Sequence, residues 1–170
     1  MSRIMKAFVF LTAVACILTS CSFSDPSSSL KELLSGGYRS QVNFTDSDGQ
    51  LIFGGIFSFS DGEYRFTVNA PEDISGMELR IYGSEVSATV EGLSVPLSGS
   101  AAGKLTWLTK LLSSVGTEES LKCEKSQLYG ADCFVCRYND ADLYFSAAGL
   151  LLIERTDGTK IHFLSFEKTE

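Results

Sequence analysis

Hydrophobic and polar residues alternate along most of the chain, which predicts β-strands. The clearest case is residues 63–71, where Tyr64, Phe66 and Val68 lie on one face and polar residues on the other. Similar segments, separated by Gly, Asn and Asp turn signals, are 38–45, 51–60, 77–83, 85–92, 93–99, 119–128, 132–139, 142–149, 150–158 and 160–168. Their short connections predict an antiparallel meander.

Two of these segments, 51–60 and 160–168, are apolar on both faces. Their apolar residues are Ile52, Phe53, Ile56, Phe57, Phe59, Ile161, Phe163, Leu164 and Phe166. A strand that is apolar on both faces is covered on both faces. We therefore expect helices on one face, and sheet curvature or an apolar concavity on the other.

The hydrophobic period changes in two places, and both predict helices. Residues 27–37 carry three leucines on one face, a serine that can cap the start, and two glycines that end the helix. Residues 101–116 carry one apolar stripe, with Trp107 at its border. The stripe consists of Leu105, Leu108, Leu111, Leu112 and Val115. It favours a helix packed on the sheet over a helix that binds a partner or a membrane.

The N-terminus has the pattern of an export signal. Arg3 and Lys6 precede a run without charge, residues 7–18, that is shorter than the roughly 20 residues of a membrane-spanning helix. Residues 18–21, Leu-Thr-Ser-Cys, resemble the lipobox of bacterial lipoproteins, which implies lipidation of Cys21 and cleavage before it. Because two or more acyl chains hold firmly in a bilayer, Cys21 would be a membrane anchor.

This pattern divides the chain into three parts. Residues 1–20 are expected to be a lipoprotein signal peptide, residues 21–28 the lipidated Cys21 and a flexible polar tether, and residues 29–170 one domain. The protein is then exported and faces the extracytoplasmic side of a bacterial membrane.

The charge excludes nucleic acid as a partner. Of the 14 basic residues, two precede residue 21, so residues 21–170 carry 12 basic and 21 acidic residues, a formal net charge of −9. Nucleic-acid binding requires basic residues that neutralise phosphates. Aromatic residues make up 11% of the chain and it has 15 Gly and only 3 Pro, which favours a β-rich domain.

The sequence contains no group of residues typical of an enzyme active site. The single histidine, His162, falls within the last predicted strand and is expected to be an ordinary strand side chain, although one histidine can serve as a base. Phosphate-binding, dinucleotide-binding and nucleophile-elbow motifs do not occur. We expect no enzymatic activity, no cofactor and no metal.

Three cysteines, Cys123, Cys133 and Cys136, remain after the signal and the anchor. Cys133 and Cys136 form a CxxC pair, but the redox form of this motif begins a helix, whereas this pair lies in a predicted strand. A hairpin that pairs residue 128 with 131 sets Cys123 opposite Cys136. We hypothesise a disulfide between those two, with Cys133 as a buried free thiol.

Two segments resemble the LolA/LolB-like lipoprotein-carrier superfamily. They are DGEYRFTVNAPEDISG, residues 61–76, and YFSAAGLLLIERTDGTKIHFLSF, residues 144–166, in which Leu150 stands where the family has proline. The resemblance implies an α+β, mainly β, fold. It consists of a strongly curved antiparallel sheet, an incomplete barrel, with a short N-terminal helix and a mid-chain helix packed on the sheet.

The resemblance implies that the concave face holds an apolar ligand, an acyl chain or a lipidated protein. The residues expected to face such a ligand are Phe53, Phe57, Phe66, Leu79, Trp107, Leu108, Leu112, Phe145 and Phe163. The alternative is a structural or protein-interaction lipoprotein with a filled core, whose partner uses the acidic outer surface. In either case we expect a monomer.

Overall fold

The alternating segments form the strands of one antiparallel sheet in the computed structural model, which describes residues 25–90 and 93–169. Residues 1–20 and Cys21 lie outside the described residues. The strands are β1 (Gly37–Thr45), β2 (Leu51–Ser60), β3 (Glu63–Ala70), β4 (Glu78–Tyr82), β5 (Glu85–Val90), β6 (Leu93–Leu97), β7 (Lys122–Leu128), β8 (Ala131–Tyr138), β9 (Ala141–Ser146), β10 (Gly149–Arg155), β11 (Lys160–Phe163) and β12 (Glu167–Thr169).

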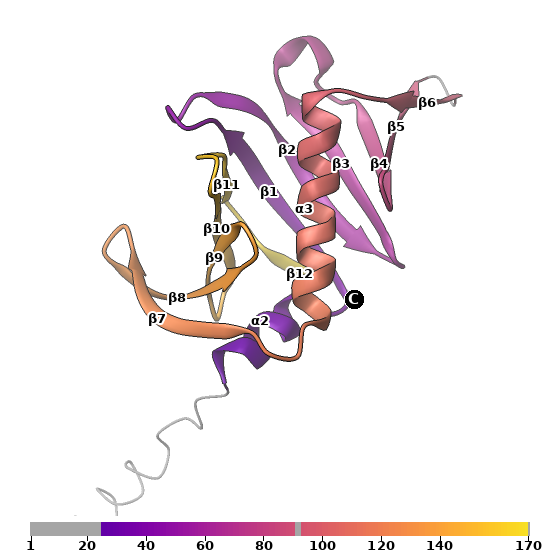
Figure 1. The fold of residues 1–170 in the computed structure, drawn as a ribbon. Coiled ribbons are helices and arrows are strands. Elements are labelled where there is room, and N and C mark those ends of the chain that lie inside the picture. Colours follow the sequence, from indigo (N-terminus) through magenta and orange to yellow (C-terminus); the bar gives the residue numbers. More distant parts are fainter. Residues whose placement is uncertain (1–24, 91–92, 170) are drawn as a thin grey trace, which may run out of the picture.

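The sheet is open and strongly curved (Figure 1). Its order is β6-β5-β4-β3-β2-β1-β11-β10-β9-β8-β7, and β12 pairs with β1 beside β11. The two ends of this order, β6 and β7, do not pair with each other, so the barrel is incomplete. The predicted fold class is confirmed.

Two α-helices of the described part lie where the sequence predicts them. Helix α2 is Pro26–Leu34, and Asp25 caps its start. The Asp25 side chain accepts a hydrogen bond from the backbone N–H of Ser27 at 3.3 Å. An acceptor at this position pairs an otherwise free N–H of the first turn. Residues 26–28, predicted as part of the tether, are therefore helical. Helix α3 is Ser100–Thr117, close to the predicted 101–116.

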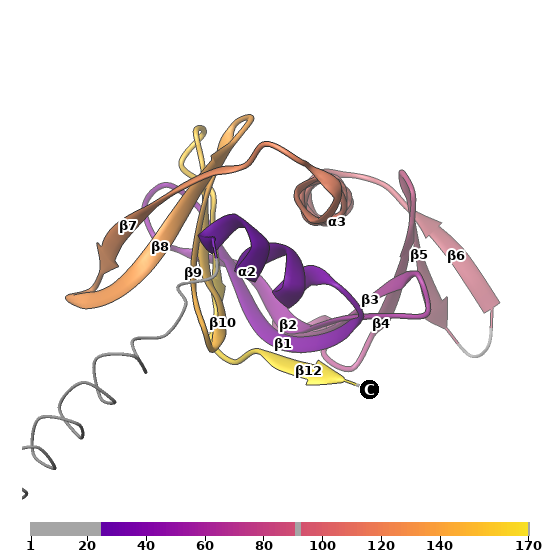
Figure 2. The same cartoon turned by 90° about the horizontal axis from the view of Figure 1, so that it is seen from below.

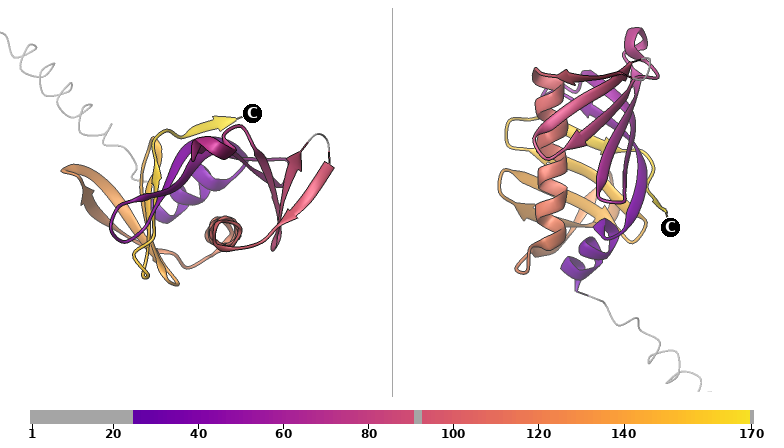
Figure 3. Two further views of the ribbon diagram at one scale, coloured as in Figure 1. Left: turned by 90° about the horizontal axis from the view of Figure 1, so that it is seen from above. Right: turned by 90° about the vertical axis from the view of Figure 1, so that its right-hand side faces the viewer.

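Helix α3 lies along the concave side of the sheet, here called the inner face, and the strands curve around it (Figures 2 and 3). The whole predicted stripe of α3 is buried. The stripe forms one hydrophobic core together with inner-face residues from both halves of the sheet, such as Phe57, Phe66 and Phe145. Its C-terminal end contacts α2, since a Cβ on Gly116 would lie 3.9 Å from the Cβ of Leu34.

The prediction of one continuous last strand over 160–168 is wrong. Strands β11 and β12 are separate, and both pair with β1. Between them the backbone N–H of Leu164 donates to the Gln41 carbonyl at 2.8 Å, and the Ser40 hydroxyl donates to the Ser165 carbonyl. Leu164 is consequently 58% exposed and not covered by a second layer.

The hairpin of β7 and β8 has the register expected from the sequence. Leu128 pairs with Ala131, and Cys123 pairs with Cys136. In the structure the sulfur atoms of Cys123 and Cys136 are joined as a disulfide. Cys133 is a buried free thiol. Because Cys133 and Cys136 are three residues apart on a strand, they lie on opposite faces of the sheet.

Candidate functional site

Helix α3 fills most of the inner face. All nine residues predicted to face a ligand belong to or pack against the same core. Eight of them are at most 7% exposed, namely Phe53, Phe57, Phe66, Leu79, Leu108, Leu112, Phe145 and Phe163. Trp107 is half-buried at the border of the helix. The structure therefore brings these residues together, but it packs them against one another and not around an open cavity.

The apolar inner face extends beyond α3 at one end of the sheet. Cross-strand partners in an antiparallel pair lie on the same face, and β5 and β6 pair Val86 with Leu97 and Ala88 with Val95. Val86 and Ala88 are buried. On β6, however, Leu93, Val95 and Leu97 are 70%, 44% and 37% exposed. These three side chains continue the core surface without a cover.

A hollow of about 500 Å³ lies between α3 and this uncovered end. Val86 and Leu97 line it from the sheet, and Ala102 and Trp107 line it from α3. The remaining lining residues are Ser84, Ser98, Gly99, Gly103, Thr106 and Lys110. The N-terminal half of α3 thus forms one wall and β5 with β6 the other.

A second hollow of about 340 Å³ follows α3 toward its C-terminal end. Tyr64, Ile81 and Tyr82 contribute to it from β3 and β4, and its remaining residues are Gly62, Gly83, Thr109, Lys110, Ser113 and Ser114. The Tyr64 hydroxyl is 3.0 Å from the Ser113 hydroxyl in this region. Lys110 borders both hollows, and together they are called the inner groove below.

Most residues of the inner groove could not be predicted from the sequence. The groove-facing residues of α3 are small or polar and lie beside the leucine stripe, so hydrophobic periodicity does not indicate them. The alternation of Leu93, Val95 and Leu97 was a usable signal. It predicts an apolar face on an edge strand, where a solvated face is expected to be polar.

Polar contacts hold the other side of α3. The Trp107 indole N–H donates to Asp140 Oδ1 at 3.4 Å, and Arg155 Nε donates to Asp140 Oδ2 at 2.7 Å. The Arg155 guanidinium also lies 5.0 Å from the centre of the Trp107 ring, a cation–π distance. These three residues, here called the polar cluster, join α3 to the strand ends of β8, β9 and β10. Trp107 thus belongs both to the polar cluster and to the lining of the inner groove.

Because of the polar cluster, we expect the folded protein to lose stability in acid. The hydrogen bond from Arg155 holds the pKa of Asp140 below its ordinary value. A carboxyl whose folded pKa is lowered stabilises the fold above its unfolded pKa of about 4, and that stabilisation is lost as the pH falls through the lower folded value. Asp140→Asn is expected to lower stability at neutral pH and to make it less dependent on pH below about 5.

Urea denaturation midpoints measured between about pH 3 and pH 7 check this prediction. The matched control is Asp73→Asn, which changes an exposed carboxyl on the short helix η1 (Glu72–Ile74). The control should keep the acid dependence of the unchanged chain. An equal acid dependence in Asp140→Asn would show that this ion pair does not stabilise the fold.

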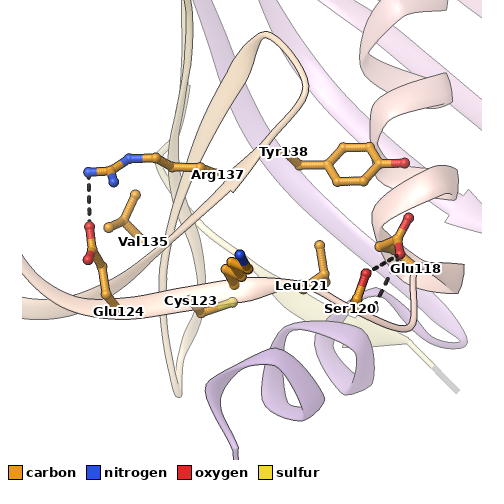
Figure 4. A pocket seen from close by; sticks show the side chains of 9 residues that line it. Glu118, Ser120, Leu121, Cys123, Glu124, Val135, Arg137 and Tyr138 are labelled. Carbon is orange, nitrogen blue, oxygen red and sulfur yellow. Dashed lines mark hydrogen bonds and ion pairs between the residues drawn. The ribbon is translucent and has the colours of Figure 1, made fainter.

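A third hollow, of about 480 Å³, lies beside the disulfide (Figure 4). Arg137 and Glu124 form an ion pair of 2.9 Å at its edge, where their side chains are 69% and 59% exposed. Glu118, at the opposite side, accepts hydrogen bonds from the backbone and the hydroxyl of Ser120. Because charges of both signs line this hollow, it suits an apolar ligand poorly.

His162 lies on β11 and is half-buried. Its Nε2 is 3.4 Å from the Thr45 hydroxyl, and burial lowers the pKa of its ring. Within residues 25–90 and 93–169 no group of His, Cys, Asp and Glu side chains is arranged to hold a metal ion. None of the helices in that part of the chain is long and apolar enough to cross a membrane.

This chain is similar to known proteins in its fold. No protein-family model and no curated protein sequence matches the chain. Among solved structures, an uncharacterized conserved protein from Thermus thermophilus matches 84% of this chain and 85% of its own, with 14% identity and a TM-score of 0.51. The two chains therefore share their overall fold.

Two further solved structures are similar to this chain, with lower TM-scores. A LolA superfamily protein from Nitrosomonas europaea matches 86% of this chain and 95% of its own, with 7% identity and a TM-score of 0.41. The lipoprotein LppX from Mycobacterium tuberculosis matches 86% of this chain and 98% of its own, with 12% identity and a TM-score of 0.42. The open curved sheet with helices on its inner face is the architecture that the resemblance in sequence implied.

Proposed function

We propose that this protein is a lipid-anchored protein of the bacterial cell envelope that binds an apolar chain in the inner groove. The observation that carries the proposal is the uncovered continuation of the core surface at Leu93, Val95 and Leu97. Contiguous apolar surface left exposed beside a hollow is typical of ligand or partner sites. The larger hollow, about 500 Å³, has the size of a small-molecule site.

The placement of the groove is compatible with an anchor at Cys21. Cys21 precedes Asp25, the cap of α2, by four residues, so an anchor at Cys21 would connect to the domain through the start of that helix. Helix α2 contacts the C-terminal end of α3, whereas the larger hollow borders its N-terminal half. An anchored domain can thus leave the larger hollow open to solution.

Titration of the full chain carrying Cys21→Ser tests the proposal, because this variant lacks the residue expected to be lipidated. Trp107 is the single tryptophan of the chain and lines the groove, so its fluorescence reports occupancy. When dodecanol, an uncharged probe, is added, the fluorescence emission of Trp107 is expected to change and to reach a plateau as the groove fills. Leu97→Ser should weaken binding about five-fold, since it removes apolar contact from the groove wall.

The matched control is Leu164→Ser, which changes an exposed leucine on the segment between β11 and β12. It should bind dodecanol as the unchanged chain does. A titration without saturation, or equal weakening in both variants, would contradict binding in the groove.

The filled core favours a second candidate, a protein-interaction lipoprotein. Eight of the nine predicted ligand-facing residues are at most 7% exposed, as a structural role requires. In that case β6, an edge strand with exposed apolar residues, would pair with a strand of a partner. Failure of dodecanol to bind would favour this candidate.

A further inference from the structure

The inner groove differs in charge from the rest of the chain. The chain as a whole has 21 acidic and 14 basic residues. Among the described residues that line the two hollows, none is acidic and one, Lys110, is basic. The hollow beside the disulfide, by contrast, is lined by Glu118, Lys122, Glu124 and Arg137. In an acidic protein, the groove therefore offers a single positive charge without a competing carboxylate.

Lys110 lies at the point where the two hollows meet. On α3 it follows Gly103 and Thr106 at helical spacing and precedes Ser113 and Ser114, so these residues form one face of the helix. Lys110 is exposed, and no carboxylate of the described part of the chain forms an ion pair with it. On the same helix, Lys104 donates instead to the Thr159 hydroxyl at 3.1 Å.

The two hollows also differ in chemistry. The larger one has apolar walls at Val86, Leu97 and Ala102, which suit a hydrocarbon chain. The smaller one carries hydroxyl groups, among them those of Tyr64 and Ser113. Hydroxyl and ammonium groups are the donors that bind a carboxylate. An amphiphile can thus lie along α3 with its chain in the larger hollow and its head at Lys110.

We propose that the ligand of the inner groove is a single-chain carboxylate, a fatty acid, and that Lys110 pairs with its headgroup. The proposal rests on the proposed function and adds the ligand class and the residue that selects it. One ammonium group matches one carboxylate in charge. The ion pair lies at the rim of the groove, so it contributes modestly to affinity and is weakened by salt.

The experiment compares dodecanoate with dodecanol at about pH 8, where a carboxyl with an ordinary pKa of about 4 is ionised. The full chain carrying Cys21→Ser is titrated with each probe, alone and with Lys110→Met added. The chain is expected to bind dodecanoate about five-fold more tightly than dodecanol. Lys110→Met should remove this preference, so that the variant binds dodecanoate and dodecanol with equal affinity.

Lys122→Met is the matched control, because it removes the same charge from exposed β7, away from the groove. It should keep the preference for dodecanoate. Raising the salt concentration should weaken the binding of dodecanoate but not of dodecanol, and only where Lys110 is present.

The outcomes separate the two proposals. If dodecanol binds but dodecanoate has no advantage, or if Lys110→Met keeps the advantage, the headgroup assignment is overturned and apolar binding stands. If neither probe binds, the proposed function fails and this inference fails with it.

Discussion

Replacement of Phe57 by alanine is expected to lower the free energy of unfolding by about 3–5 kcal/mol. Phe57 is fully buried at the centre of the inner face. Its ring centre lies 6.4 Å from that of Tyr38 and 5.5 Å from that of Tyr64, and it pairs across strands with Phe66. Removing the ring leaves a cavity in a core formed by α3 and both halves of the sheet.

Urea denaturation of Phe57→Ala, with Leu164→Ala as the control, measures this effect. Leu164 is 58% exposed, and its replacement should change the free energy of unfolding by less than about 0.5 kcal/mol. A loss below about 1 kcal/mol in Phe57→Ala would mean that α3 does not close the inner face as described. The result bears on where the ligand binds, because a closed inner face leaves the groove beside α3 as the accessible site.

Loss of the bond between Cys123 and Cys136 is expected to cost about 3 kcal/mol. The two cysteines are 13 residues apart, so the bond closes a short loop and restricts the unfolded chain. Strand β7 is the last strand of the sheet order and pairs with β8 alone, so it has few other contacts that hold it. The double variant Cys123→Ala/Cys136→Ala should therefore unfold at a lower urea concentration.

Cys133→Ala serves as the control, because it removes a buried thiol without changing the loop. Its effect should be smaller, about 1 kcal/mol. Alkylation of the denatured, exported protein, followed by peptide mass analysis, tests the pairing itself. Without reductant, only Cys133 of the three cysteines should react, and reaction at all three would contradict the disulfide.

The parts of the fold that depend on local periodicity could be predicted from the sequence. The leucines of 101–116 recur at helical spacing, and the alternation around Phe66 fixes which face of β3 is buried. The register of β7 and β8 follows from a tight turn at Gly130, which has a positive φ of 80°. Each of these features depends on residues that are close together in the chain.

The parts that depend on long-range contacts could not be predicted. The break between β11 and β12 results from hydrogen bonds of Ser40 and Gln41 with residues more than 120 positions away. Likewise, the degree to which α3 covers the inner face depends on the curvature of the sheet. The alternation of Leu93, Val95 and Leu97 indicates an apolar face on β6, whereas the extent to which α3 leaves that face uncovered, and the position of Lys110 beside it, required the structure.

Native mass spectrometry of the full chain carrying Cys21→Ser tests the central claim most directly. The account predicts that the purified protein carries a non-covalent ligand, that the released ligand is a fatty acid, and that its occupancy falls in Leu97→Ser and Lys110→Met but not in Lys122→Met. A chain that carries no ligand, even after incubation with dodecanoate, would contradict the account.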